Sequence, residues 1–525
     1  MENIYGREKL LKACDENLRY LSSRFKYLSV KAGMSLEGKT IWSGAFGKLA
    51  EQDDTHLMCI FSLSKLYTMF CCLLARDEQR LCLEDSITKY LPHIHLFYKG
   101  ADVTQSITLC HLLCHTSGLQ HEATVGNNFF HHSSLSAHIE SINGNNLLFR
   151  PGSHYAYSNL GYDLLGYILT LVYGECFEEL MQNHLFSKLG MQHISYRQDN
   201  RCQSPSGGMK ASFSDLLCGL NWVTDQTGAG GFLSSDSWKQ MQSFVELRKN
   251  QRSGYGFAVK VFHESGTPIC CITGYFRNTY FVQMWSAKYR MGYIGIFYGF
   301  TEVVRKALDT HDVLFNQIQE MESQGRVTEK SAKRRRKMKP LRPIQLDGIY
   351  ISLSGRILCL RQTVEAVSLS WDQRVWESIE WDNDERLIYG CVELILDHSR
   401  DRVSGIFYNA AGNFDYFFYN CPLNLCLPPN EEAVERIFAL DLTKAKTEET
   451  RSHLRMYNRV NRIVLTYTAD GLYLNRLYML EHLKDNVYLK STGEPVMIED
   501  DAIWVGNLKY VELPMSSPNN RQKDV

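Results

Sequence analysis

Ser62 and Lys65 are the two side chains in this sequence whose types and spacing point most directly to chemistry. They belong to Ser62-Leu63-Ser64-Lys65, which follows the apolar residues 57–61, so we expect a strand ending near Phe61 and a helix after it. One helical turn then places the hydroxyl and the amine on the same face. A serine becomes a good nucleophile when a neighbour takes its proton, and a partly desolvated lysine can do so. On its own, the pattern also fits a capping serine beside a solvated lysine.

Tyr157 and Asn159 form a second polar element, within Tyr155-Ala156-Tyr157-Ser158-Asn159, well downstream of the first. A tyrosine is protonated at neutral pH, but a nearby Lys65 ammonium would favour the phenolate and make Tyr157 a candidate general base. Taken singly, Tyr157 fits a buried aromatic residue and Asn159 fits a helix cap. Their order after Ser62 and Lys65 favours an active site.

With Ile272-Thr273-Gly274 as a third element, the layout resembles the active site of the penicillin-recognising serine hydrolases. Tyrosine in the second element makes the branch of class C β-lactamases, D,D-peptidases and esterases the closer match. The resemblance covers roughly residues 20 to 320 and includes the strand pair about Glu37-Gly38 and the segments Leu83-Glu84-Asp85, Leu112-Leu113-Cys114-His115-Thr116-Ser117-Gly118-Leu119 and Ser206-Gly207-Gly208-Met209. It implies an α/β (α+β) domain of the β-lactamase/transpeptidase type, with a central antiparallel sheet flanked by helices.

The resemblance also implies a role for each matching residue. Ser62 would be the acylated nucleophile, Lys65 its proton partner, Tyr157 the general base and then acid, Asn159 a substrate-positioning amide, Thr273 and Gly274 parts of the substrate-binding strand, and Tyr275 the second oxyanion N–H donor. Ile272 departs from the pattern, because the family has lysine or histidine there. A backbone donor survives that change, whereas recognition of a substrate carboxylate should weaken.

We therefore expect a serine hydrolase that forms an acyl-enzyme with an ester or amide, including one with a D-configured residue, in a small molecule or peptide. Two alternatives remain: a catalytically inactive binding or assembly protein, motivated by Ile272, and a thioesterase or acyltransferase of the penicillin-binding-protein type. No cofactor or metal is expected. Cys110-His111-Leu112-Leu113-Cys114-His115 has four candidate zinc ligands, but no second ligand pair stands near it in the sequence.

Composition limits the other possibilities. The chain has 525 residues, 44% hydrophobic residues and a formal net charge of −1, which favours two or three globular domains and gives no reason to expect nucleic acid as a partner. The 16 cysteines lie in apolar runs without a regular spacing, as buried thiols of a reducing compartment do. The N-terminus lacks a secretory pattern and no apolar run spans a membrane, so we expect a cytoplasmic protein; the sequence carries no signal for oligomeric state.

Three segments are expected in order: a hydrolase domain at 1–322, a basic linker at 323–343 and a β-rich domain at 344–525. The hydrolase domain would end with a helix at 303–321, and the linker contains Lys333-Arg334-Arg335-Arg336-Lys337. Short alternating runs after residue 344 predict antiparallel strands, compatible with the lipocalin-like barrel of some family members. A charged stretch at 431–458 is expected to be helical.

Overall fold

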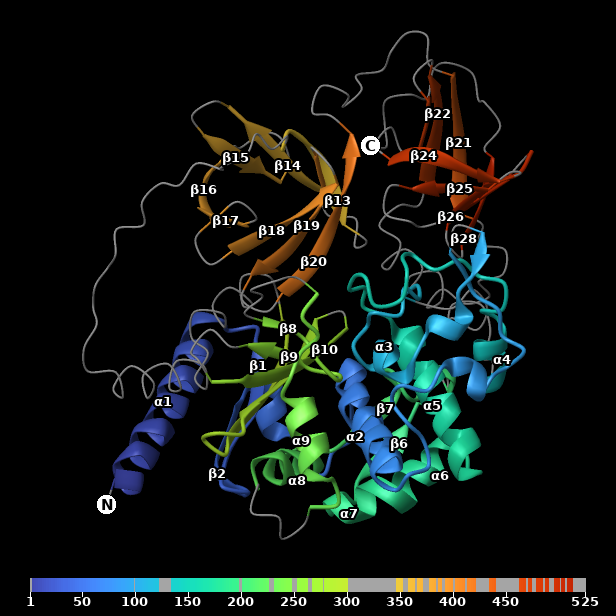
Figure 1. Ribbon diagram of the computed structural model, residues 1–525. Helices are drawn as coiled ribbons and strands as arrows, with labels where there is room; N and C mark the ends of the chain where they lie inside the picture. Colours follow the sequence, from blue (N-terminus) through green and yellow to red (C-terminus); the bar gives the residue numbers. More distant parts are fainter. Residues whose placement is uncertain are drawn as a thin grey trace.

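The computed structural model describes residues 2–300 except for 99, 122–133, 198–200, 226–230, 248–252, 263–266 and 277, and, from 346 to 512, the strands and a few of their connections. The helix expected at 303–321 and the basic linker lie outside the described residues. Figure 1 shows a lower domain of sheet and helices, with strands of the C-terminal part above it. No helix in the described ranges is both long and apolar enough to cross a membrane.

A seven-stranded antiparallel sheet forms the centre of the N-terminal domain, in the order β2-β1-β12-β11-β10-β9-β8. Its strands are β1 (Ser29–Leu36), β2 (Lys39–Phe46), β8 (Ser253–Tyr255), β9 (Lys260–Phe262), β10 (Ile269–Phe276), β11 (Thr279–Ser286) and β12 (Met291–Tyr298). β1 pairs with β12 from Ser29 opposite Tyr298 to Leu36 opposite Met291. The predicted turn at Glu37-Gly38 is confirmed, and both residues have positive φ, 51° and 77°, as a two-residue hairpin with right-handed twist requires.

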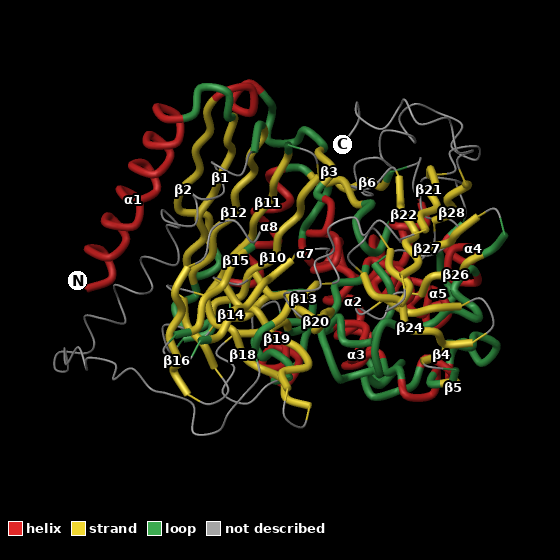
Figure 2. Tube along the Cα trace, turned by 90° about the horizontal axis from the view of Figure 1, so that it is seen from above, coloured by secondary structure: helices red, strands yellow, loops and turns green. Residues whose placement is uncertain are grey.

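Helices cover both faces of this sheet, as the view in Figure 2 shows for α1 (Glu2–Arg24) and α8 (Phe213–Thr224). Alternation along β1 explains the arrangement, because Val30, Ala32 and Met34 pack in one cluster with residues of α1. The intervening Lys31 and Ser35 face α8, with the Lys31 Nζ 5.4 Å from the Phe213 ring centroid and the Ser35 Oγ 2.7 Å from Asn221 Oδ1. The expected sheet between helices is thus confirmed.

The remaining helices and short strands pack beside the sheet on the α8 side. The helices are α2 (Ser64–Asp77), α3 (Leu109–Leu113), α4 (Leu135–Glu140), α5 (Asn159–Tyr173), α6 (Phe177–Met181), α7 (Ser187–Leu189) and α9 (Ser235–Met241). The short strands are β3 (Met58–Cys59), β4 (Phe97–Tyr98), β5 (Ala101–Asp102), β6 (Ile194–Tyr196) and β7 (Met209–Ala211). Twelve residues of α2, from Ser64 to Ala75, are buried, so α2 is the central helix of this layer.

The C-terminal strands close into two antiparallel barrels, each with its strands in sequence order. The first contains β13 (Gly348–Ser352), β14 (Ile357–Gln362), β15 (Val367–Ser370), β16 (Glu377–Asn383), β17 (Arg386–Tyr389), β18 (Val392–Ser399), β19 (Arg402–Ala410) and β20 (Asn413–Cys421). The second contains β21 (Val434–Leu440), β22 (Arg462–Thr468), β23 (Gly471–Leu474), β24 (Tyr478–Lys484), β25 (Val487–Lys490), β26 (Pro495–Ile498), β27 (Ala502–Val505) and β28 (Leu508–Glu512). This up-and-down order is that of lipocalin-type barrels.

The β-rich region was expected, but its division into two closed barrels was not indicated by the sequence. The expected helix at 431–458 is wrong where the structure describes it, since Val434–Leu440 is strand β21. β21 closes the second barrel by pairing with β28, and the Arg436 Nη2 lies 2.7 Å from Glu512 Oε2. The charge of Arg436 therefore belongs to a cross-strand ion pair and not to the solvated face of a helix.

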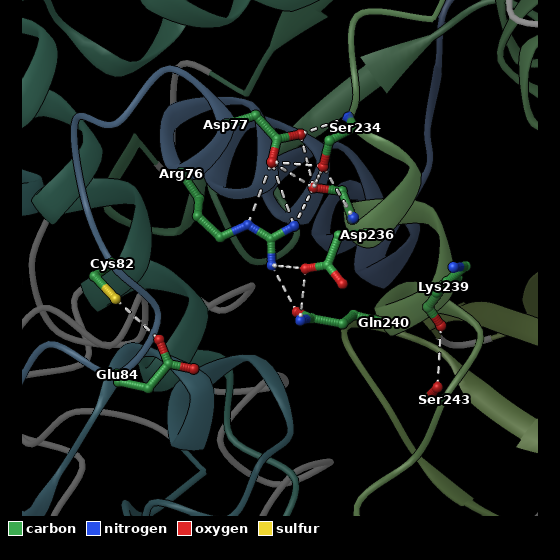
Figure 3. Close-up of polar contacts among 10 residues, drawn as sticks. Arg76, Asp77, Cys82, Glu84, Ser234, Asp236, Lys239, Gln240 and Ser243 are labelled. Atoms are coloured by element: carbon green, nitrogen blue, oxygen red, sulfur yellow. Dashed lines mark hydrogen bonds and ion pairs between the residues drawn. The ribbon is translucent and has the colours of Figure 1, made fainter.

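A polar cluster fixes the C-terminal end of α2 to the N-terminus of α9 (Figure 3). The Asp77 carboxylate accepts hydrogen bonds from the Ser234 N–H at 2.7 Å and from the Ser234 Oγ at 2.9 Å, and the Ser237 Oγ lies 2.7 Å from Asp77 Oδ2. Arg76 adds an ion pair at 3.3 Å. Burial opposes ionisation, but these bonds and the Arg76 charge outweigh it and hold the pKa of Asp77 below its ordinary value.

Asp77→Ala should lower the free energy of unfolding by about 2 kcal/mol, because several donors lose their acceptor. A lowered folded-state pKa stabilises the protein above the unfolded-state pKa, so the difference from wild type should be full at pH 7 and shrink as pH falls below about 4. Chemical denaturation at several pH values measures it. Asp236→Ala is the control, because Asp236 is 70% exposed and 3.7 Å from Arg76; a loss as large as that of Asp77→Ala would contradict this account.

Candidate active site

Ser62 lies in a single 3₁₀ turn, Phe61–Leu63, that leads directly into α2. The helix was expected to contain Ser62 in its first turn, whereas α2 begins at Ser64 and the preceding strand β3 ends at Cys59. Phe61 has φ of 50°, an unfavourable conformation for a bulky residue that persists only where packing enforces it. Its ring packs against Phe276 and Phe281 at centroid distances of 5.3 and 6.1 Å. The residue before the candidate nucleophile is thus held in a strained conformation by β10 and β11.

Lys65 points into the centre of the site and is fully buried, with an exposed fraction of 0%. Its Nζ lies 3.4 Å from Ser62 Oγ, 2.6 Å from Asn159 Oδ1 and 2.7 Å from the Ser206 carbonyl oxygen. Three oxygens around one amine match the three donors of an ammonium. Of the sequence-predicted residues, Ser62 and Asn159 therefore both contact Lys65.

The aromatic ring of Tyr157 lies beside the Lys65 amine. Lys65 Nζ is 4.9 Å from the Tyr157 ring centroid and 5.6 Å from that of Tyr162, both within the range of a cation–π interaction. Ser158 caps α5 by accepting a hydrogen bond from the Gly161 N–H, so Asn159 is the first helical residue and not the cap. The Asn159 side chain does not cap the helix; its Oδ1 accepts from Lys65 Nζ.

The third element lies on β10, where Gly274 allows the strand to approach the turn that contains Ser62. A Cβ at position 274 would lie 2.3 Å from the Ile60 carbonyl oxygen and 3.3 Å from the Leu63 backbone nitrogen, so a side chain there would separate the two segments. Thr273 is half-buried and Tyr275 is 57% exposed. Ile272 is 3% exposed and belongs to the main apolar cluster. The position at which the family has lysine or histidine is therefore filled here by a buried apolar side chain.

One edge of β10 continues past its neighbour. β9 pairs with β10 only over Ile269–Cys271, whereas β11 pairs with it from Cys270 to Phe276. The backbone of Thr273, Gly274 and Tyr275 therefore has one side outside the sheet ladder. Such an edge can receive the extended backbone of a substrate, in the way that peptides add to exposed sheet edges.

His115 holds the chain on both sides of Tyr157, a role that the sequence did not reveal. Its carbonyl oxygen accepts from the Ala156 N–H at 2.9 Å, and its Nδ1 accepts from the Ser158 N–H at 3.0 Å. The imidazole also packs against the Tyr157 ring, with centroids 4.3 Å apart. Burial, with the charges of Lys65 and His121, holds the pKa of His115 well below its ordinary value, so the imidazole stays neutral and keeps Nδ1 as an acceptor.

The other members of the Cys110–His115 motif also have structural partners. His111 completes a capping box with Thr108 at the start of α3, and a hydrogen bond from Cys114 lowers the pKa of the Cys110 thiol. In the described ranges no three His, Cys, Asp or Glu side chains are grouped to hold a metal ion.

His115→Phe keeps an aromatic ring but leaves the Ser158 N–H without an acceptor, which should cost about 1–3 kcal/mol of unfolding free energy. His115→Asn retains an acceptor near Nδ1 and should lose less. Because the pKa of His115 is lower in the folded state, His115 of the unfolded chain takes up a proton at a higher pH than His115 of the folded protein. Wild-type stability should therefore fall relative to His115→Phe as pH drops below about 6.5. Denaturation at pH 8 and pH 5 measures both effects; equal losses in the two variants would contradict the role of Nδ1.

Comparison with known proteins agrees with the fold of the N-terminal domain. The family model described as Beta-lactamase matches residues 25–285. Protein flp of Staphylococcus aureus (strain MW2) is 32% identical over 142 residues, 27% of this chain and 28% of that protein. The putative penicillin-binding protein PbpX of Bacillus subtilis (strain 168) is 29% identical over 185 residues, 34% of this chain and 44% of that protein. The chain thus spans less than half the length of these curated relatives.

Solved structures show the same fold. The structure of SurE with D-Leu superimposes with a TM-score of 0.54 at 14% sequence identity, covering 78% of this chain and 99% of that one. At that identity the likeness concerns the fold alone. The family model and the ordered motifs carry the assignment, and through residues 25–285 this chain belongs to the β-lactamase-related family of serine hydrolases.

Proposed function

We propose that this protein is a serine hydrolase that acts through an acyl-enzyme on Ser62. The observation that carries the proposal is the position of the buried Lys65 amine, 3.4 Å from Ser62 Oγ and bonded to both Asn159 Oδ1 and the Ser206 carbonyl. Burying an amine in a core is costly unless it is fully bonded, and one that also reaches a half-buried serine supports a catalytic use.

In the proposed reaction, Ser62 Oγ attacks the substrate carbonyl carbon and its proton passes to the group formed by Lys65 and Tyr157. Backbone N–H groups of Ser62 and Tyr275 would stabilise the oxyanion, as preorganised donors do in acyl transfer. The proton then goes to the leaving alcohol or amine, and the acyl group remains on Ser62. Water attacks the acyl-enzyme in the second half, with Tyr157 as the base. Asn159 would position the acyl side and Thr273 and Gly274 the strand-like part of the substrate.

The proposed substrates are neutral esters or amides in a small molecule or peptide. Ile272 is buried and uncharged where the family carries a cation, so a free carboxylate at this end of the substrate gains no partner from that residue. We include substrates with a D-configured residue, because the structure of SurE, which has the same fold, was solved with D-Leu. We place the reaction in a reducing compartment, because the cysteines of the described ranges are thiols and not disulfides, and several of them are buried.

Acyl transfer to an amine within the same substrate is the second candidate, because an amine can resolve an acyl-enzyme as water does. It shares the acyl-enzyme and differs only in the nucleophile that resolves it. The mass of the product separates the two, since hydrolysis adds one water and cyclisation adds none. A non-catalytic binding role is the outcome to be accepted if Ser62 cannot be acylated.

An alkyl fluorophosphonate should add once to the wild-type protein and not to Ser62→Ala, as intact mass measures. Lys65→Ala should slow labelling by about 100-fold or more, because the group that handles the Ser62 proton loses the amine that contacts both Ser62 Oγ and the Tyr157 ring. Ser64→Ala is the matched control and should keep the adduct, since the Ser64 Oγ donates to the Phe61 carbonyl at 2.6 Å. Folded wild-type protein without an adduct would overturn the proposal.

Ile272→Lys should restore a partner for substrate carboxylates. The comparison uses two esters that differ in one group, a free carboxylate or its neutral carboxamide. The ratio of kcat/KM for the carboxylate ester to that for the neutral ester should be about tenfold higher in Ile272→Lys than in wild type. Ile272→Met tests shape without charge and should leave that ratio unchanged. The same gain in both variants would mean that Ile272 limits space and does not select against charge.

A further inference from the structure

Ser206 holds the buried lysine and is itself held from the opposite side. Its carbonyl oxygen accepts from Lys65 Nζ at 2.7 Å. Its N–H donates to Asp163 Oδ1 at 3.1 Å and also faces the Gln203 carbonyl oxygen at 3.2 Å. The contacts with Lys65 and Asp163 are buried. A main-chain acceptor fixes a lysine only as well as its own residue is fixed, and the bond from the Ser206 N–H to Asp163 is the side-chain contact that holds this residue next to its carbonyl.

Asp163 has a second partner behind it. Its Oδ2 lies 3.2 Å from His138 Nε2 on α4, and both side chains have an exposed fraction of 0%. A buried carboxylate is costly unless its oxygens are bonded, and here one oxygen faces the imidazole and the other the Ser206 N–H. The proposed chemistry uses neither Asp163 nor His138 directly.

Helix α5 therefore reaches Lys65 by two routes. Asn159 and Asp163 are four residues apart on this helix, which places them on one face. Asn159 bonds Lys65 directly at 2.6 Å, while Asp163 acts through Ser206. The loop that contains Ser206 lies close against α5, because a Cβ at Gly166 would be 2.2 Å from Pro205 Cγ.

We propose that Asp163, backed by His138, is a positioning residue for Lys65: its carboxylate holds the N–H of Ser206, so that the carbonyl of the same residue keeps the amine directed at Ser62. This inference rests on the proposed function. Asp163 lies behind the amine and does not touch the substrate, so its loss should slow acylation of Ser62 without weakening the preceding binding step.

The test separates the rate constant of acylation from binding, as kinact and KI for the alkyl fluorophosphonate. Asp163→Ala removes the side-chain acceptor and leaves only the Gln203 carbonyl for the Ser206 N–H. A misdirected lysine should lower kinact about 10- to 100-fold while KI stays constant. Asp163→Asn keeps an amide oxygen for the Ser206 N–H and should return kinact to within about threefold of wild type. Equal loss in both variants, or wild-type kinact in Asp163→Ala, would overturn the proposal.

Asp215 gives a matched control, since it is also buried, with 2% exposure. It accepts from the backbone N–H groups of Gln192 at 2.7 Å and His193 at 2.8 Å. Asp215→Ala should lower the melting temperature and leave kinact unchanged. A fall in kinact matching that of Asp163→Ala would attribute the effect to general loosening of the core and overturn the positioning role.

The double variant Asp163→Leu/His138→Leu covers the case in which Asp163→Ala does not fold, because apolar replacement of a whole buried pair is often tolerated. It too should show low kinact at constant KI. If wild-type protein gives no adduct, the proposed function fails while the positioning role is still measured by NMR of ¹³C-lysine protein. The Lys65 Cε signal should move in Asp163→Ala and stay in Asp163→Asn; an unmoved signal in both would reject the role.

Discussion

Burial of the Lys65 amine is the constraint on which the rest of the site depends. An ammonium taken out of water needs a full set of acceptors, and those around Lys65 come from three separate parts of the chain: Ser62 before α2, Asn159 on α5 and Ser206 in the loop before β7. Their convergence requires the helices to be packed at fixed distances. The apolar burial of α2 and the polar anchor at Asp77 serve that requirement.

The site combines a rigid side with an open one. Lys65, His115 and Asp163 are fully buried, and each has a neighbour that fixes its direction, whereas Ser62, Tyr157 and Asn159 are only half-buried. Tyr275 is exposed, and β10 continues beyond the last residue that pairs with β9. Rigid support behind reactive groups that remain accessible is what preorganised acyl transfer needs.

The sequence predicted the parts of this site that are side chains in local motifs. Ser62 and Lys65 lie one turn apart whatever surrounds them, and the Tyr157-Ser158-Asn159 segment is equally local. Ser206 was missed as a partner because its carbonyl carries no residue-specific signal, and Asp163 and His138 because only tertiary packing brings α4, α5 and the loop together. His115 was noted as a family residue and as a zinc candidate, but its contacts to both sides of Tyr157 depend on the fold. Barrel closure likewise depends on pairings such as β21 with β28, which alternation within a single strand does not specify.

The pairing of β1 with β12 has a consequence for synthesis on the ribosome. Ser29 to Leu36 are made early, yet their partner on one side, Met291 to Tyr298, is made only near the end of this domain. Until then β1 has only β2 beside it. The apolar side chains of β1 that pack with α1 still lack their contacts with β12. A nascent chain would therefore hold an incomplete sheet through most of its elongation, with unpaired strand edge and apolar surface of the kind that makes partly folded chains prone to aggregate.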